Sequence, residues 1–141
     1  MAAPPVGAHL AKEMCFDAEA IRTTALHVGD ANPLHHDADI AAASRFGELI
    51  ASGAYTSGRL AGLLSEGFGD EMADGKGQVG VDYNVRFIAP VRVDRLMRLE
   101  WTVSELEPRR SGTIARLEGR IVDTTTDTVA VTAEMKLFYF G

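Results

Sequence analysis

A carboxylate and an imidazole, Asp30 and His35, stand five residues apart in segment 30–35, which reads DANPLH. Pro33 fixes its own backbone angle and keeps Asn32 out of the helical region, so the segment must be an irregular and stiff loop. Two such groups at one rigid place can share the proton transfers that add or remove water, and each typically contributes roughly 10²–10⁴-fold. The segment therefore predicts an acid–base site with Asp30 and His35 as its catalytic residues.

The same segment has an alternative interpretation without catalysis. Asp30 and Asn32 beside Pro33 also favour a plain turn, because Asx-type hydrogen bonds and a fixed proline angle stabilise turns.

Metal ligation is a further alternative, since four imidazole and carboxylate side chains follow one another closely: His35, His36, Asp37 and Asp39. Such groups suit several divalent ions. Adjacent histidines do not match common zinc spacings, however, so the sequence predicts no metal site. We expect His36 to lie at the surface or in a pocket wall.

Three helical segments surround this loop. Asp17 is a plausible N-cap for a helix that continues to about His27, before Gly29. A short helical turn is expected over 39–44, with Asp37 or Asp39 as its cap. The segment 53–68 is the most apolar candidate helix, yet it contains several glycines, each of which costs about 1 kcal/mol against alanine. We expect it to be stabilised by burial, with a sheet wrapped around its small residues.

After Lys76 the hydrophobic pattern changes to a period of two. Apolar residues alternate with polar ones over 79–87, 97–103, 115–121 and 129–139, where the first stretch has Val79, Val81, Tyr83, Val85 and Phe87 on one face. Helices followed by antiparallel strands predict an α+β domain. A further short strand is expected near Met14.

Length and composition indicate one globular domain over residues 1–141, with 1–12 as a loose lead-in. The chain is 46% hydrophobic and 24% charged, with a formal net charge of −6 and no basic stripe, so nucleic acid is not an expected partner. The lone Cys15 permits no intrachain disulfide. No apolar stretch reaches the roughly 20 residues of a membrane span. We expect no secretory signal, because the first residues lack a charged start followed by an apolar run. We expect a cytoplasmic location.

Two motifs resemble those of MaoC-like hydratases, a family that includes the (R)-specific enoyl-CoA hydratases. The first is GDANPLH at 29–35, followed by Asp37 and by RFG at 45–47. The second is RFIAPV at 86–91, which is similar to a strand of that family ending in Phe-x-x-Pro-Val. The resemblance extends from about Phe16 to the C-terminus.

This resemblance implies a hot-dog fold, in which an antiparallel sheet wraps around one central helix, and a homodimer with the thioester site near the subunit interface. It implies that Asp30 and His35 hold a water that adds to a trans-2-enoyl-CoA. It further implies that the N–H of Gly53 binds the thioester oxygen and that Asn32 holds the loop together. No cofactor is implied, because CoA is part of the substrate.

The sequence departs from the family where the central helix starts. The family usually has His-Gly-Met there, and this chain has Ser52, Gly53 and Ala54. We expect these three residues, together with Asn32, to form the substrate-binding set. Ala61 stands where a characterised hydratase places a serine. Tyr55 and Arg59 are weaker candidates for ligand contact, and the cations that could meet CoA phosphates are Arg45, Arg86 and Arg92.

Two other functions stay open from the sequence. Hot-dog domains also hydrolyse acyl-CoA thioesters, and a catalytically weak subunit could bind acyl-CoA for a partner. The segment 30–35 favours hydration over both.

Overall fold

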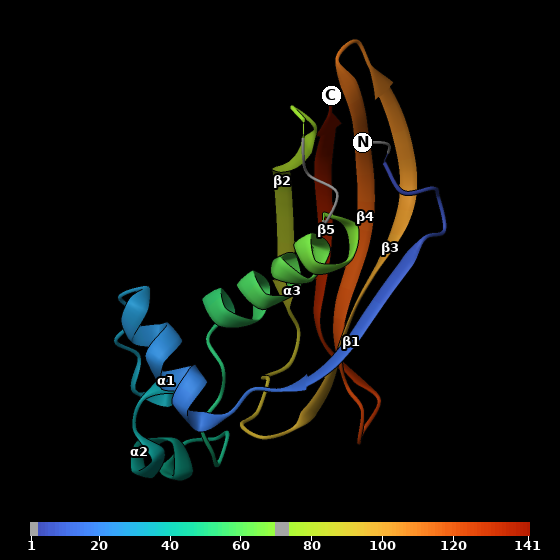
Figure 1. Ribbon diagram of the computed structural model, residues 1–141. Helices are drawn as coiled ribbons and strands as arrows, with labels where there is room; N and C mark the ends of the chain where they lie inside the picture. The colour runs from blue at the N-terminus through green and yellow to red at the C-terminus, as the bar shows by residue number, and fades with distance from the viewer. Residues whose placement is uncertain (1–2, 70–73) are drawn as a thin grey trace.

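The protein forms one five-stranded antiparallel sheet in a computed structural model that describes residues 3–69 and 74–141. The strand order is β1-β3-β4-β5-β2. The strands are β1 (His9–Cys15), β2 (Gly77–Phe87), β3 (Leu96–Arg109), β4 (Gly112–Asp123) and β5 (Thr128–Phe140). The three long hairpin strands β3, β4 and β5 form the centre, and β1 and β2 are the two edges (Figure 1).

The helices begin where polar side chains cap them. Asp17 accepts a hydrogen bond from the N–H of Ala20 at 2.8 Å and begins α1 (Ala18–His27). Asp37 caps α2 (Ala38–Ala43), and Ser52 caps α3 (Gly53–Phe68). A 3-10 turn, η1 (Pro33–His35), lies between α1 and α2. Over residues 3–69 and 74–141, no helix has both the length and the apolar character that a membrane span requires.

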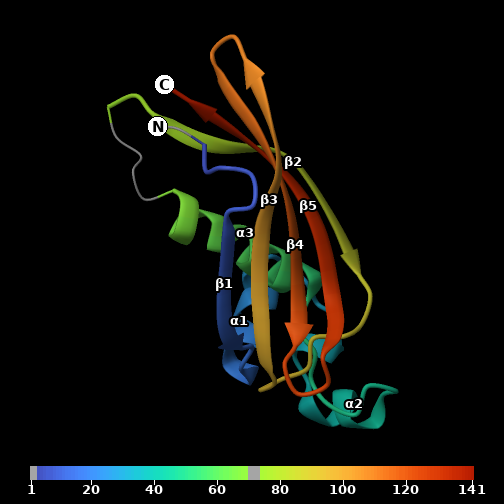
Figure 2. The same ribbon diagram turned by 90° about the vertical axis from the view of Figure 1, so that its right-hand side faces the viewer.

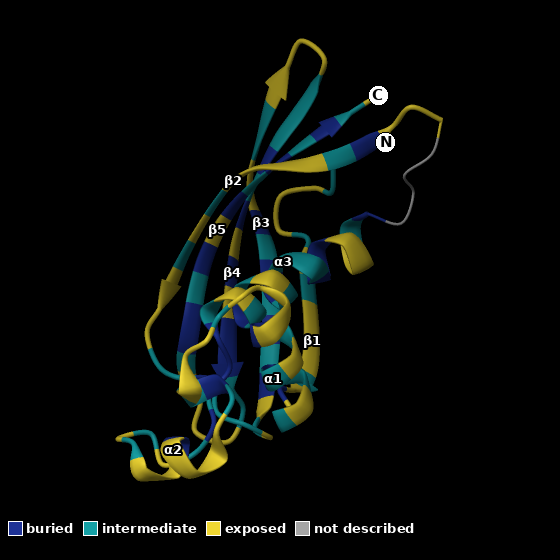
Figure 3. Ribbon diagram, turned by 90° about the vertical axis from the view of Figure 1, so that its left-hand side faces the viewer, coloured by how far each residue is buried: buried dark blue, intermediate teal, exposed yellow. Residues whose placement is uncertain are grey.

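The core lies between α3 and one face of the sheet. Leu60, Leu63 and Leu64 of α3 are buried there, and Trp101 of β3 is completely buried. Figure 3 shows buried stretches of the central strands in dark blue. The helices lie on the same side of the sheet, as the view turned by 90° from Figure 1 shows (Figure 2). The predicted α+β hot-dog fold is confirmed, and so is the extent of the central helix.

The lead-in expected over residues 1–12 is shorter than predicted. Residues 9–12 already belong to β1, which pairs with β3 from His9 opposite Thr102 to Cys15 opposite Leu96. Few apolar residues mark β1 in the sequence, because it is an edge strand whose side chains are mostly exposed. Residues 1 and 2 lie outside the described part of the chain.

The alternation expected along β2 is wrong at its first half. The register shifts between Gly80 and Asp82, which leaves Val81 as the extra residue of a β-bulge. Val79 consequently pairs with Phe138 on the face away from α3, whereas Tyr83 pairs with the buried Met135. One inserted residue moves every side chain on one side of it to the other face, and period-two reasoning cannot detect that.

Close approach explains only some of the small residues in α3. A Cβ at Gly67 would lie 2.3 Å from a methyl carbon of Leu10, and one at Gly53 would lie 2.8 Å from the ring of Phe87. At Gly58, by contrast, a Cβ would meet nothing within 4 Å. The sheet therefore packs closely against one side of α3, while the other side, which includes Ala54 and Gly58, is exposed.

Two sheet side chains bind carbonyl groups of α3 directly. The hydroxyl of Tyr83 donates to the carbonyl oxygen of Ser57 at 2.7 Å, and Nε1 of Trp101 donates to that of Leu60 at 2.7 Å. Burial raises the pKa of Tyr83 to about 12, so the phenol is a neutral donor at ordinary pH. These two bonds fix both the rotation and the axial position of a helix that its glycines leave intrinsically weak.

We expect Tyr83→Phe to lower the free energy of unfolding by about 0.5–1.5 kcal/mol, because it deletes a buried hydrogen bond and little volume. Tyr139→Phe is the matched control, since the buried Tyr139 hydroxyl has no hydrogen-bond partner among the described residues. The control variant should be as stable as the parent or more stable. Urea unfolding measures both, and equal losses in the two variants would contradict the role given to Tyr83.

Candidate functional site

The loop with Asp30 and His35 is fixed to the end of α1. Gly29 adopts a φ of +76°, which ends the helix, and the N–H of Asp30 then donates to the carbonyl of Ala25 at 2.8 Å. Oδ1 of Asn32 accepts from the N–H of Leu34 at 3.1 Å and so caps η1. The loop is the proline-stiffened turn that the sequence predicts, and Asn32 has a holding role within it.

His35 has one determined tautomer when it is neutral. Its ring is buried, with 7% of the residue exposed, and Nδ1 lies 2.7 Å from the carbonyl oxygen of Ile50. A carbonyl can only accept, so Nδ1 must carry the proton and donate. The lone pair of the neutral ring is then on Nε2, which is the nitrogen that faces Asp30.

The carboxylate of Asp30 presents one free oxygen to this nitrogen. Oδ1 accepts from the N–H of Asn32 at 3.0 Å, and Oδ2 lies 3.6 Å from Nε2 of His35. That separation exceeds a direct hydrogen bond. The carboxylate is partly open to solvent, with 34% of the side chain exposed. Two acceptors of neighbouring side chains therefore converge on one place that a water molecule can reach.

The segment that leads into α3 is held like a short strand. The N–H of Ala51 donates to the carbonyl of Val91 at 2.8 Å, and the N–H of Val93 donates to that of Leu49 at 3.0 Å. Val91 belongs to the second family-like motif, so this motif positions the start of the helix. The carbonyl of Ile50, which binds His35, lies within the same segment.

The N-terminus of α3 offers free backbone donors. The hydroxyl of Ser52 accepts from the N–H of Tyr55 at 3.1 Å, and the N–H of Thr56 is bonded to the carbonyl of Ser52. In the described part of the chain, the N–H groups of Gly53 and Ala54 have no acceptor. Free N–H groups at a helix N-terminus stabilise negative charge. Ser52 is buried and occupied as a cap, which gives it a structural role at a position where we expected substrate contact.

Two candidate ligand contacts on α3 have other partners. The ring of Tyr55 packs edge-on against Phe16, with centroids 4.8 Å apart, and burial is the main cause that raises its pKa. The guanidinium of Arg59 binds Glu66 at 2.8 Å along the helix. Ala61 is half-buried on the same helix.

Two of the three arginines expected near CoA phosphates, Arg45 and Arg92, share a contact with Phe46. Arg92 donates to the carbonyl of Phe46 and lies 3.5 Å from Glu48. The guanidinium of Arg45 stacks over the ring of Phe46 at 5.3 Å and is exposed. Arg86 pairs with Thr132 on the sheet face away from α3, so the structure does not bring it to Asp30 and His35.

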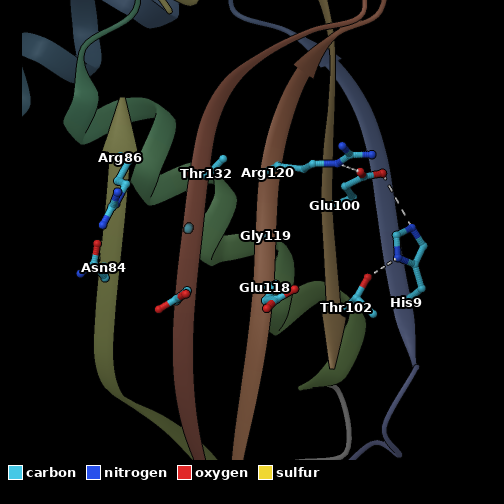
Figure 4. Close-up of a pocket in the computed structure, with 11 residues that line it drawn as sticks. His9, Asn84, Arg86, Glu100, Thr102, Glu118, Gly119, Arg120 and Thr132 are labelled. Atoms are coloured by element: carbon cyan, nitrogen blue, oxygen red, sulfur yellow. Dashed lines mark hydrogen bonds and ion pairs between the residues drawn. The ribbon is translucent and has the colours of Figure 1, made fainter. Parts of the chain in front are cut away.

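A pocket of about 620 Å³ lies on that outer face of the sheet, away from the loop (Figure 4). Side chains of neighbouring paired strands line it. One of them, Glu100, binds both Arg120 and Arg98. Burial acts to raise the pKa of Glu100, but its bonds and charge interactions with the two arginines bring the pKa below the usual value. Paired acidic and basic side chains of this kind are typical of the solvated face of an antiparallel sheet.

The metal alternative finds no support in the positions of its side chains. Asp37 caps α2, and the two histidine rings bind different carbonyl groups, His35 that of Ile50 and His36 that of Asp30. No group of three potential His, Cys, Asp or Glu ligands occurs in the described residues. The sequence did not predict the contact between His36 and Asp30. The two adjacent histidines are the one sequence feature that points to it, and their adjacency does not say which carbonyl group each ring binds.

The chain is similar to known proteins over most of its length. The family model described as "MaoC like domain" matches residues 5–130. A 3-hydroxybutyryl-CoA dehydratase of Methylorubrum extorquens is 39% identical over 82 residues, which are 58% of this chain and 49% of the relative. The match thus spans about half the length of that curated relative.

Two solved structures extend the likeness over nearly the whole chain. The (R)-hydratase of A. caviae involved in PHA biosynthesis has a TM-score of 0.82 and 28% identity, covering 95% of this chain and 96% of that one. A MaoC-like dehydratase of Rhodospirillum rubrum has a TM-score of 0.80 and 25% identity, covering 97% and 93%.

The contact between Gly53 and Phe87 generates a prediction that does not depend on activity. Gly58→Ala should raise the free energy of unfolding by up to about 1 kcal/mol, because alanine favours the helix and the site is open. Gly53→Ala should show no such gain, since its methyl group would displace the Phe87 ring. In a Phe87→Ala background, Gly53→Ala should no longer carry the cost of displacing the ring. Thermal or urea unfolding of the four variants tests this, and a full gain from Gly53→Ala alone would contradict the contact.

Proposed function

Because the chain belongs to the MaoC-like domain family, we propose that it adds water reversibly to a trans-2-enoyl-CoA and gives a 3-hydroxyacyl-CoA. The observation that carries the proposal is the 3.6 Å gap between Oδ2 of Asp30 and Nε2 of His35, where both atoms are acceptors in the neutral form of the ring. Two acceptors at this distance repel each other unless a proton lies between them. A water that donates one hydrogen to each resolves the conflict, and its oxygen lone pair is then available for attack.

The reaction balances with these two groups alone. The water oxygen forms a bond to C3 of the enoyl group, and the π electrons of the C2–C3 bond move toward C2 and the thioester oxygen. One of the two acceptors takes the proton that water loses, and the Asp30–His35 pair delivers a proton to C2. The pair ends in the state in which it began, and dehydration follows the same steps in reverse.

The N-terminus of α3 suits the charge that builds up during this step. Negative charge on the thioester oxygen is stabilised by preorganised N–H donors, and losing one such donor typically costs on the order of 10²–10³ in rate. The N–H groups of Gly53 and Ala54 are the free donors. They follow Ile50, whose carbonyl binds His35, by only a few residues, so that donors and acceptors belong to one connected unit.

Substitution of either acceptor tests the assignment. We expect Asp30→Asn and His35→Ala each to lower turnover of crotonyl-CoA by at least about 10²-fold, because each removes one partner of the water. Loss of enoyl absorbance measures turnover, and the midpoint of thermal unfolding confirms that each variant is folded. Turnover near that of the parent in both variants would contradict the roles of Asp30 and His35.

The same assay separates hydration from thioester hydrolysis. A thiol reagent added to saturated and unsaturated acyl-CoA substrates detects free CoA. Loss of enoyl absorbance without thiol supports the hydratase, whereas thiol release from a saturated acyl-CoA identifies a thioesterase. Acyl-CoA binding without either change identifies a non-catalytic binding subunit.

The proposal includes a homodimer formed through β2. This edge strand is 11 residues long, and it exposes Val81 (53%), Phe87 (58%) and the following Ile88 (61%). An exposed apolar edge is a template for pairing with another strand. The opposite edge, β1, carries exposed Lys12 and Glu13, which oppose such pairing. Since Phe87 also touches Gly53, a second copy at β2 would lie beside the thioester site, as the family resemblance implies.

Charge on the β2 edge should dissociate this dimer. We expect the Val81→Lys/Ile88→Lys double variant to sediment as a monomer at a concentration where the parent is a dimer. Ala11→Lys on the β1 edge is the matched control and should leave the dimer intact. A monomeric parent, or a control that dissociates as readily as the double variant, would contradict an interface at β2.

A further inference from the structure

Consecutive histidines hold the same aspartate from two sides. His35 faces the carboxylate of Asp30, whereas Nε2 of His36 lies 2.5 Å from the backbone carbonyl oxygen of Asp30. Because a carbonyl accepts only, Nε2 of His36 is the donor, both in a neutral ring and in a protonated one. The neutral forms of the two adjacent rings thus have opposite tautomers: His35 carries its proton on Nδ1 and His36 on Nε2.

His36 is itself held in place from α1. Nε of Arg22 donates to the carbonyl of His36 at 3.1 Å, and the N–H of His36 donates to the carbonyl of Pro33 at 3.1 Å. Its side chain is half-buried between these elements. The ring therefore bridges the end of η1 and Asp30, at the start of the loop after α1.

This bond completes the fixation of Asp30. The N–H of Asp30 is bound to Ala25, its Oδ1 accepts from the N–H of Asn32, and its carbonyl accepts from His36. Only Oδ2 is left for a water. Fixing the peptide groups on both sides of the Cα atom sets the direction of the Asp30 side chain. This direction matters because a displacement of about 1 Å in a catalytic group can cost about 10²-fold in rate.

We propose that His36 is a positioning residue, which aims the carboxylate of Asp30 through its backbone carbonyl without touching substrate. The proposal rests on the proposed hydratase function, and it deepens the account of that site. A residue of this kind raises turnover and leaves substrate binding almost unchanged, because it acts on the group that handles water and not on the surface that binds CoA.

Two amide substitutions at position 36 discriminate between donor positions. The amide nitrogen of glutamine lies about where Nε2 of histidine lies, whereas that of asparagine lies about where Nδ1 lies. We expect His36→Gln to retain most of the kcat for crotonyl-CoA. His36→Asn and His36→Ala should lower kcat at least about tenfold, with KM changed less than about threefold. His27→Ala, at the exposed end of α1, is the control for removing a histidine from this region.

The pH dependence of kcat separates positioning from proton transfer. If His36 only positions Asp30, the limbs of the profile stay at the same pH in His36→Asn while the whole profile is lowered. A limb that disappears would overturn the proposal, because His36 would then exchange protons with substrate. Equal kcat in the glutamine, asparagine and alanine variants would overturn it as well.

A measurement without catalysis keeps this proposal apart from the hydratase assignment. ¹⁵N NMR of histidine-labelled protein, assigned with His36→Gln, should show His36 protonated at Nε2 and His35 at Nδ1. If the parent protein turns over no enoyl-CoA, the proposed function fails whatever this spectrum shows. If the parent is active and His36 is protonated at Nδ1 instead, the positioning role fails while the function stands.

Discussion

The hydrogen bond from Nδ1 of His35 to the carbonyl of Ile50 is the interaction on which the site depends. It sets the tautomer of the ring, and it joins the loop after α1 to the segment that enters α3. The reciprocal bond from the N–H of Ile50 to the carbonyl of Leu34 makes this junction two-sided. This one connection therefore fixes the acceptor atoms of Asp30 and His35 relative to the N-terminus of α3. Neither the loop nor the helix could do this alone.

The site is rigid because contacts with the sheet hold α3 in position, which the helix could not do by itself. With its glycines, α3 has little intrinsic stability, and its position comes from contacts with the surrounding strands. Tyr83 and Trp101 bind two of its carbonyl groups, while residues 91–93 hold the segment in front of it. The positions of the backbone donors at Gly53 and Ala54 are thus set by side chains from β2 and β3, which lie far away in the sequence.

Much of this arrangement could be predicted from the sequence, because it follows from local rules. Caps and terminators define α1 and α3, proline defines the loop, and alternation defines three of the strands. The exceptions have physical causes that lie outside local pattern. A single bulged residue, Val81, reverses the faces of the first part of β2. The strand expected near Met14 is present as β1, but its full extent from His9 follows from its pairing with β3 and not from its composition. The roles of Ser52 and His36 depend on where a neighbouring N–H or carbonyl group points, which spacing does not encode.

The position of the site near an edge of the sheet would connect the proposed catalysis with the proposed dimer. Phe87 ends the apolar edge strand and its ring lies against Gly53, so the same side chain belongs to the exposed edge and to the start of α3. A ring that is 58% exposed gains from being covered, because apolar area removed from water contributes roughly 25 cal/mol per Å². Burial of this edge by a second copy would also restrict the movement of the ring beside the backbone donors. Dimer formation and the preorganisation of the thioester site would then depend on one surface, which is a physical reason for the site to lie there.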